Sequence, residues 1–295
     1  MRLGIDIGGT KTAVAAVAPN GAVLAQRSAP SGRGPAEVTQ VAARLARETV
    51  AAAGVPADAV GACMPGMVDP HSGVVRHAVN LDVDELDLAA GLAWELHLPV
   101  SVDNDVKDAA LGAALHVGNG GTGGTLAYLN LGTGLAAAVV RDGRVLRGPD
   151  GAVGEIGHLP VGSGIRCQCG QLGCLETLAS GSAVARVWRP APGQRTDPLA
   201  AAAAGDADAS RAADMLADGV AQALQLLAIS VGPDRVVLGG GVAKAQGLAE
   251  AVRAAIARRA VSSDFVASLR LDTRFEVLPA ELPVASLGAS LLPTR

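Results

Sequence analysis

Three of the four cysteines lie within eight residues, and a histidine precedes the first of them by nine positions; these residues are His158, Cys167, Cys169 and Cys174. One histidine and three cysteines form the ligand set of a closed tetrahedral zinc site. Two carboxylates, Glu155 and Glu176, flank the group. A zinc knot that only held the fold together would not need them. We therefore expect Glu155, His158 and Glu176 to surround a small polyol, with a purely structural knot as the alternative.

Three apolar segments each end in a glycine-rich turn. The turns are Gly8-Gly9-Thr10-Lys11, Gly132-Thr133-Gly134 and Gly239-Gly240-Gly241. Glycine lets backbone N–H groups approach an anion and adopt positive φ values. Each turn alone is more typical of an ordinary tight turn, and none matches the P-loop or the dinucleotide fingerprint. Together they predict a nucleotide site across a cleft, with two turns on the β- and γ-phosphates and the third beside the adenosine.

Polar residues at two strand ends are the next candidates for chemistry. Asp6 comes just before the first turn, where it would hold Mg²⁺ directly or through water; capping of the turn is the alternative. Asn104 and Asp105 follow a predicted strand and precede a predicted helix over 106–116. An amide beside a carboxylate can bind neighbouring hydroxyls of a polyol. The alternative is that Asp105 only caps the helix.

The elements that carry these residues follow a repeated plan. The opening predicts strands over 3–7, 12–17 and 22–28, with an Asn-Gly hairpin between the last two. The segment from Asn130 repeats the order of strand, glycine turn, strand, Asp-Gly hairpin and strand. This internal duplication predicts two similar α/β domains, with a boundary near Gly118–Gly124. Further expected elements are helices over 36–53, 212–231 and 248–260, strands over 59–63 and 235–238, and a surface connection over 189–210.

Composition excludes several classes of function. The 295 residues are 49% hydrophobic and only 2% aromatic, with a formal net charge of −4. We expect no nucleic-acid partner, because neither a basic surface nor stacking aromatics are provided. The sequence shows neither a leader nor an apolar run of about 18 residues, so we expect no membrane segment. Clustered cysteines with a histidine indicate metal binding in a reducing cytoplasm, not disulfides.

Taken in order, these motifs resemble the ROK family of repressors, open reading frames and kinases, within the actin/hexokinase/Hsp70-like ATPase superfamily. The similarity covers nearly the whole chain, and the actinobacterial glucokinases are the nearest subgroup. The motifs are Asp6-Ile-Gly-Gly-Thr-Lys11, Asn104-Asp105, Gly132-Thr-Gly134, Gly154-Glu-Ile-Gly-His158 and Cys167-Gln-Cys169-Gly-Gln-Leu-Gly-Cys174-Leu-Glu176.

The resemblance implies a fold and an activity. Two ribonuclease H-like α/β domains would enclose a central cleft: a smaller domain over 1–117 with a C-terminal helix at about 284–295, and a larger domain over 118–283 with the zinc motif. The activity implied is ATP- and Mg²⁺-dependent phosphorylation of a hexose, usually at the 6-hydroxyl. Family members are commonly homodimers or homotetramers, and a cytoplasmic location is expected.

The resemblance also assigns roles by position. Asp105 matches the general base, and Asn104 and Asn80 match residues that bind the sugar. Glu155 and Glu176 match carboxylates on the ring hydroxyls, and His158 matches a residue that binds both zinc and sugar.

The chain departs from the usual family pattern at Lys107, at Ala136–Ala138 and over Leu81–Asp84. These departures leave a sugar-like cyclitol or an N-acetylated amino sugar as an alternative acceptor. A non-catalytic sugar sensor is a remoter alternative. A repressor is not expected, since only five residues precede Asp6.

Overall fold

The computed structural model describes residues 1–118, 123–149, 151–190 and 197–293. Contacts divide the chain into two compact units. Unit 1 comprises Met1–Thr122, Gly143–Val145 and Pro283–Arg295, and unit 2 comprises Gly123–Asp142 and Leu146–Leu282. Residues 119–122, which belong to the expected boundary segment, lie outside the described ranges.

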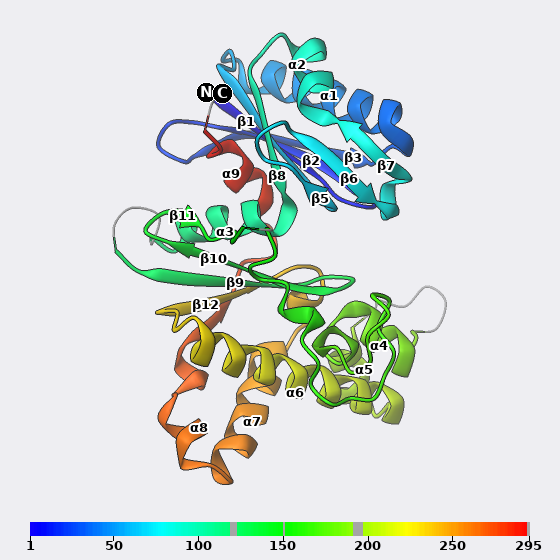
Figure 1. Ribbon diagram of the computed structural model, residues 1–295, viewed down its shortest axis with the longest axis vertical. Helices are drawn as coiled ribbons and strands as arrows, with labels where there is room; N and C mark the ends of the chain where they lie inside the picture. The colour runs from blue at the N-terminus through cyan, green and yellow to red at the C-terminus, as the bar shows by residue number, and fades with distance from the viewer. Residues whose placement is uncertain (119–122, 150, 191–196, 294–295) are drawn as a thin grey trace. The chain divides into compact units, whose positions relative to one another are not determined.

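A five-stranded mixed sheet forms the centre of unit 1 (Figure 1). Its order is β3-β2-β1-β4-β8. The strands are β1 (Arg2–Ile7), β2 (Lys11–Val17), β3 (Val23–Pro30), β4 (Ala59–Met64) and β8 (Val100–Asn104). β1 pairs antiparallel with β2 and parallel with β4, so β1, β4 and β8 end at the same edge. That edge carries Asp6, Met64 and Asn104.

Helices cover this sheet, and a small second sheet adjoins it. The helices are α1 (Gly34–Ala53), α2 (Leu88–Leu96), α3 (Asp105–His116) and α9 (Val284–Ser290). The small sheet contains β5 (Met67–Val68), β6 (Val74–Ala78) and β7 (Val83–Asp87), with the 3₁₀ turn η1 (Val79–Leu81) between the last two. α1 buries Val38 and Leu45 at helical spacing and ends at Gly54, whose φ of 67° is a typical C-terminal cap.

Glycines let α9 pack directly on its neighbours in unit 1. A Cβ on Gly288 would clash with the Asp108 carbonyl of α3, and a Cβ on Gly112 would clash with the Val284 carbonyl of α9. The two backbones therefore meet without side chains between them. This close approach fixes α3, and with it the strand end that precedes it.

Unit 2 contains a second five-stranded sheet with the order β11-β10-β9-β12-β13. Its strands are β9 (Thr125–Leu131), β10 (Leu135–Arg141), β11 (Arg144–Val145), β12 (Arg235–Gly239) and β13 (Phe275–Val277). β9 pairs antiparallel with β10 and parallel with β12, as β1 does with β2 and β4. The predicted duplication into two similar α/β domains is thereby confirmed.

The remaining elements of unit 2 are mostly helical. They are α4 (Gly181–Val187), α5 (Pro198–Ala203), α6 (Ala207–Ser230), α7 (Leu248–Val261), α8 (Asp264–Ser268) and the 3₁₀ turns η2 (Ile156–His158), η3 (Leu175–Thr177), η4 (Val242–Lys244) and η5 (Leu271–Thr273). α6 and α7 lie side by side in Figure 1 and share a core with the sheet. By length and composition α6 would suit a membrane span, but half of its apolar window is buried, as in a core helix.

Two sequence predictions are wrong in detail. The segment over 189–210 is not only a surface connection, because α5 and the start of α6 lie within it. Asp197 and Asp206 are the N-caps of these helices and accept hydrogen bonds from the first-turn N–H groups. Residues 191–196 are outside the described ranges. The C-terminal helix expected at 284–295 ends at Ser290.

Candidate active site

The four predicted zinc ligands come together in unit 2. Their ligand atoms, from His158, Cys167, Cys169 and Cys174, all lie within 4.8 Å of one another. The Sγ atoms of Cys169 and Cys174 are 3.6 Å apart, and Cys167 Sγ lies 3.8 Å from His158 Nδ1. A tetrahedral zinc ion with Zn–S bonds of about 2.3 Å would place two sulfurs about 3.8 Å apart. The donor set and its spacing therefore fit a zinc ion.

A short irregular hairpin presents these ligands. Pro160 bridges to Cys174, and Arg166 bridges to Leu172. The turn between the arms closes when the Gly170 N–H donates to the Cys167 carbonyl, with Gly170 at a φ of 93°. Hydrogen bonding from Gln171 lowers the pKa of Cys169 to about 6, so this thiol ionises readily and suits a metal.

Two glycines hold the Gly154–His158 segment against β10. A Cβ on Gly154 would clash with the Ala137 carbonyl, and a Cβ on Gly157 would clash with the Leu135 carbonyl. The Ala137 N–H also donates to the Gly154 carbonyl at 2.7 Å. The segment is thus fixed to the sheet. This fixes the backbone positions of His158 and of the exposed Glu155.

Glu176 contacts both the zinc ligands and a glycine turn. Its Oε1 accepts a hydrogen bond from Cys167 Sγ at 2.9 Å and lies 3.8 Å from His158 Nδ1. Burial and this hydrogen bond raise the pKa of Cys167 to about 12. A Cβ on Gly134 would lie 2.9 Å from Glu176 Oε2. Only a glycine therefore fits at this point of the turn without displacing the carboxylate.

The second and third glycine turns lie together in unit 2. The Gly132 and Thr133 carbonyls accept hydrogen bonds from the Gly181 and Ser182 N–H groups at 2.8 and 3.0 Å. A Cβ on Gly240 would lie 2.7 Å from Asn130 Oδ1, at the neighbouring strand end. The ends of β9 and β12 therefore form one region of close backbone approach. Gly239 and Gly241 flank Gly240 there, with Gly239 packed under the Tyr128 ring.

The first glycine turn belongs to unit 1. The Gly8 N–H donates to the Lys11 carbonyl at 3.0 Å, and Thr10 and Lys11 are exposed. Burial, then the negative charge of Asp105, raises the pKa of Asp6 to about 7. Lys11 and the Cys63 thiol act in the opposite direction. Asp6 and Asp105 are therefore close enough to interact. Two neighbouring carboxylates of this kind can bind one cation and can hold one proton between them.

The structure changes the interpretation of Asn104 and Asp105. The N-cap of α3 is Asn104, whose Oδ1 accepts hydrogen bonds from the N–H groups of Val106 and Lys107 at 3.1 and 3.3 Å. Asp105 is the first residue of the helix, so the alternative that Asp105 only caps the helix is wrong. The Asn104 amide donates to the Gly66 carbonyl at 3.5 Å.

Asn80 lies in the turn η1 and is exposed. A Cβ on Gly9 would lie 3.2 Å from Asn80 Cβ, so this turn contacts the first glycine turn. Leu81 and Val83 are buried in the core of unit 1, whereas Asp82 and Asp84 are exposed. Of the unusual Leu81–Asp84 stretch, only the two acids remain accessible to a ligand.

Sequence reasoning missed Ser31 and Arg33. Ser31 Oγ donates to the Gly8 carbonyl at 2.6 Å, and Arg33 Nη1 donates to the Asn80 carbonyl at 2.9 Å. Their position between β3 and α1 was the only signal, because neither residue stands in a motif. Cys63, which looked isolated in the sequence, is buried with its Sγ 3.9 Å from Asp6 Oδ1.

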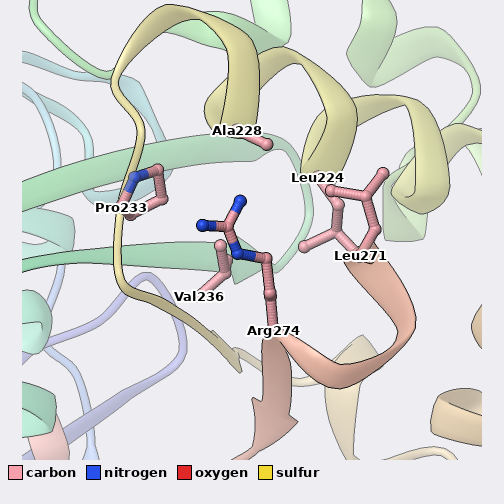
Figure 2. A pocket seen from close by; sticks show the side chains of 6 residues that line it. All are labelled: Leu224, Ala228, Pro233, Val236, Leu271 and Arg274. Carbon is pink, nitrogen blue, oxygen red and sulfur yellow. The ribbon is translucent and has the colours of Figure 1, made fainter. Parts of the chain in front are cut away.

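Figure 2 shows an apolar pocket in unit 2 lined by Leu224, Ala228, Pro233, Val236, Leu271 and Arg274. It lies between α6, β12 and η5. None of the predicted site residues lines it. We therefore attribute it to imperfect packing of α6 on the sheet.

Comparison with known proteins decides the family. The model of the ROK family matches residues 2–281. The chain belongs to the ROK family. A glucokinase of Halalkalibacterium halodurans is 32% identical over 267 residues, which cover 82% of this chain and 81% of that protein. The resemblance inferred from the motifs is thereby confirmed.

Solved structures of ROK proteins agree in fold. A ROK hexokinase from Thermus thermophilus has a TM-score of 0.80 at 32% identity and covers 98% of this chain and 96% of that one. A ROK glucokinase from Streptomyces griseus, solved with glucose and AMPPNP, has a TM-score of 0.76 at 28% identity and covers 98% and 97%. The expected actin/hexokinase-like two-domain fold is therefore confirmed.

Proposed function

We propose that this ROK protein is an ATP-dependent hexose kinase, with glucose as the first candidate acceptor and the 6-hydroxyl as the acceptor group. The observation that carries the proposal is similarity along nearly the whole chain to a ROK glucokinase structure that holds glucose and AMPPNP. The glucokinase relative from Halalkalibacterium halodurans points to the same activity.

The chemistry we assign is direct phosphoryl transfer. The sugar hydroxyl attacks the γ-phosphorus, the bond to the β-phosphate oxygen breaks, and ADP leaves. Asp105 accepts the hydroxyl proton. Its place at the start of α3, next to the negative charge of Asp6, supports this role. Phosphoryl transfer otherwise needs mainly positioning and charge stabilisation.

The remaining site residues bind and orient the two substrates. We assign the sugar hydroxyls to Asn80, Asn104, Glu155, His158 and Glu176. The three glycine turns would hold the nucleotide through backbone N–H groups. Asp6 would hold Mg²⁺, which neutralises phosphate charge when bound. Zn²⁺ bound to the four knot ligands would fix the orientation of His158 and the loop that carries Glu176.

The test is acceptor-dependent ADP release with Mg-ATP. The panel contains glucose, mannose, fructose, N-acetylglucosamine, N-acetylmannosamine and cyclitols, with Asp105→Asn as control and the phosphorylated position determined by NMR. Turnover on glucose at the 6-position, lost in the control, is the expected outcome. Turnover on a cyclitol or an N-acetylated sugar alone would make Lys107, Asp82 and Asp84 the first residues to examine for acceptor choice. If none of the acceptors on the panel causes ADP release, the kinase proposal is overturned in favour of a sensor.

We also propose a reducing, cytoplasmic setting and a homo-oligomeric state. Cys169 is exposed and close to Cys174, so oxidising conditions would favour a disulfide over a metal. Exposed apolar side chains such as Trp94, Val261 and Phe265 offer surface for self-association. Size-exclusion chromatography with light scattering measures the assembly.

A further inference from the structure

Ser31 forms two hydrogen bonds to the first glycine turn and a third to Thr12 of β2. Its Oγ donates to the Gly8 carbonyl at 2.6 Å and lies 2.9 Å from Thr12 Oγ1. Its N–H donates to the Thr10 carbonyl at 3.1 Å. Ser31 is partly buried, so these bonds are shielded from water. The Gly8 and Thr10 carbonyls are thereby occupied, and these bonds fix the backbone of the turn.

Arg33, two residues later, holds the turn that carries Asn80. Its Nη1 donates to the Asn80 carbonyl at 2.9 Å and lies 3.4 Å from Asp82 Oδ2. Asp82 has a φ of 56°, a conformation that aspartate tolerates better than most residues. The Asp82 N–H donates to the Val79 carbonyl at 3.2 Å. The turn is therefore closed by its own bond between Asp82 and Val79, and Arg33 holds it at the Asn80 carbonyl.

The segment between these two residues is itself fixed. The Arg33 N–H donates to Glu37 Oε2 at 2.8 Å. Gly32 is buried, and a Cβ there would lie 2.6 Å from backbone and side-chain carbons of Glu37. Arg33 also occupies the N-cap position of α1. The backbone position of Arg33 is thus fixed. Less conformational entropy is therefore lost when its side chain binds the Asn80 carbonyl.

The two turns held by this segment also contact each other. A Cβ on Gly9 would lie 3.2 Å from Asn80 Cβ. We infer that Ser31–Arg33 is a positioning element that ties the phosphate-binding turn Gly8–Lys11 to the sugar-binding turn Val79–Leu81. Ser31 acts on the donor side and Arg33 on the acceptor side. The inference rests on the proposed function, because that function assigns the two ligands.

The competing explanation is a surface contact that has no effect on ligand binding. Side chains of Arg33 and Asp82 are 60% and 66% exposed, and such ion pairs contribute only about 0–1 kcal/mol. The contact with the Asn80 carbonyl differs, since it restrains the backbone of a ligand-binding residue. A hydrogen bond of this kind corresponds to about a fivefold change in an equilibrium.

Arg47 provides a matched control in the same unit. Its Nη1 donates to the Glu95 carbonyl at 3.1 Å, and its Nη2 lies 3.1 Å from Glu95 Oε2. Its side chain is 54% exposed, close to that of Arg33. It joins α1 to α2, away from both turns. Arg47→Ala thus removes the same kinds of contact without touching the proposed positioning element.

The experiment measures KM for acceptor and ATP separately in Arg33→Ala, Arg33→Lys, Ser31→Ala and Arg47→Ala. We expect Arg33→Ala to raise the acceptor KM about fivefold or more, with the ATP KM within about twofold. Ser31→Ala is expected to raise mainly the KM for ATP and to change the acceptor KM less. Arg33→Lys should recover part of the loss, because the ammonium nitrogen can donate to the Asn80 carbonyl. Arg47→Ala should leave both KM values unchanged.

The outcomes separate the inference from the proposed function. If Arg33→Ala and Arg47→Ala have equal kinetics, or if Arg33→Ala raises both KM values alike with a matching fall in Tm, the positioning role is lost. If the wild type releases no ADP with any acceptor, the proposed function fails. Amide hydrogen exchange at residues 79–82 then tests the tie directly: faster exchange in Arg33→Ala than in Arg47→Ala supports it, and equal exchange overturns it.

Discussion

In unit 1 the glycine turn after β1 is held by hydrogen bonds from Ser31 and contacts a turn held by Arg33. In unit 2 the corresponding turn after β9 contacts Glu176, whose loop carries the predicted zinc ligands. The strand orders are the same. Duplication thus preserved the sheets, while the loops at the strand ends acquired different supports. Unit 1 uses hydrogen bonds at this point, whereas unit 2 brings together one histidine and three cysteines whose spacing fits a metal ion.

The largest expected effect concerns Asp105, the proposed base, which lies in unit 1. Asp105→Asn should lower kcat by about 10²–10⁴-fold and leave acceptor binding in place, because the amide cannot accept the hydroxyl proton. Steady-state kinetics and acceptor titration measure the two effects. Glu48→Gln, which changes an exposed acid of α1 in the same unit, is the control. A loss below about tenfold in Asp105→Asn would remove Asp105 from the role of base.

The second prediction addresses the support that only unit 2 has. The purified protein should contain about one zinc per chain, and Cys169→Ser should lose the metal, much of the activity and thermal stability together. Metal analysis and Tm measure these losses. Cys63→Ser is the control, because Cys63 is buried in unit 1 outside the knot; this variant should keep the zinc. An active wild type without metal would leave the knot with no role in the reaction.

The third prediction compares the glycines at which each turn contacts its neighbour. Gly134→Ala places a methyl group 2.9 Å from Glu176 Oε2, and Gly9→Ala places one 3.2 Å from Asn80 Cβ. We expect both to lower kcat/KM for the acceptor, by about tenfold or more for Gly134→Ala and less for Gly9→Ala. Gly91→Ala, whose methyl group meets only the Thr39 side chain at 3.2 Å, should have normal kinetics. Equal kinetics in all three variants would mean that the turns tolerate displacement.

The smallest expected effect is a pH dependence confined to unit 1. The pKa of Asp6 is about 7, above the ordinary aspartate value of about 3.9. The folded protein therefore favours protonated Asp6, and ionised Asp6 lowers the unfolding free energy. This cost develops as the pH rises from about 4 to about 7 and is complete above it.

Asp6→Asn removes this cost. Its unfolding free energy relative to the wild type should increase between pH 5 and pH 8, as followed by urea denaturation. Mg²⁺ should reduce the difference by stabilising the ionised wild-type carboxylate. A difference that stays constant with pH would show that Asp6 titrates as an ordinary exposed acid.

The sequence determined those features whose causes are local. The four predicted zinc ligands all lie within residues 158–174, so their types and spacing were sufficient to predict that these side chains come together. The duplicated sheets were predictable for the same reason, because strand, glycine turn and hairpin signals follow one another directly along the chain. The family motifs likewise consist of neighbouring residues.

Tertiary structure decided which distant side chains meet. Arg33 reaches the carbonyl of Asn80 across 47 positions, and the charge of Asp105 acts on Asp6 only because β1, β4 and β8 end at one edge. The assignment of the α3 cap to Asn104 in place of Asp105 also required the backbone. Such contacts depend on how sheets and helices pack, and this packing cannot be derived from the spacing of residues along the chain.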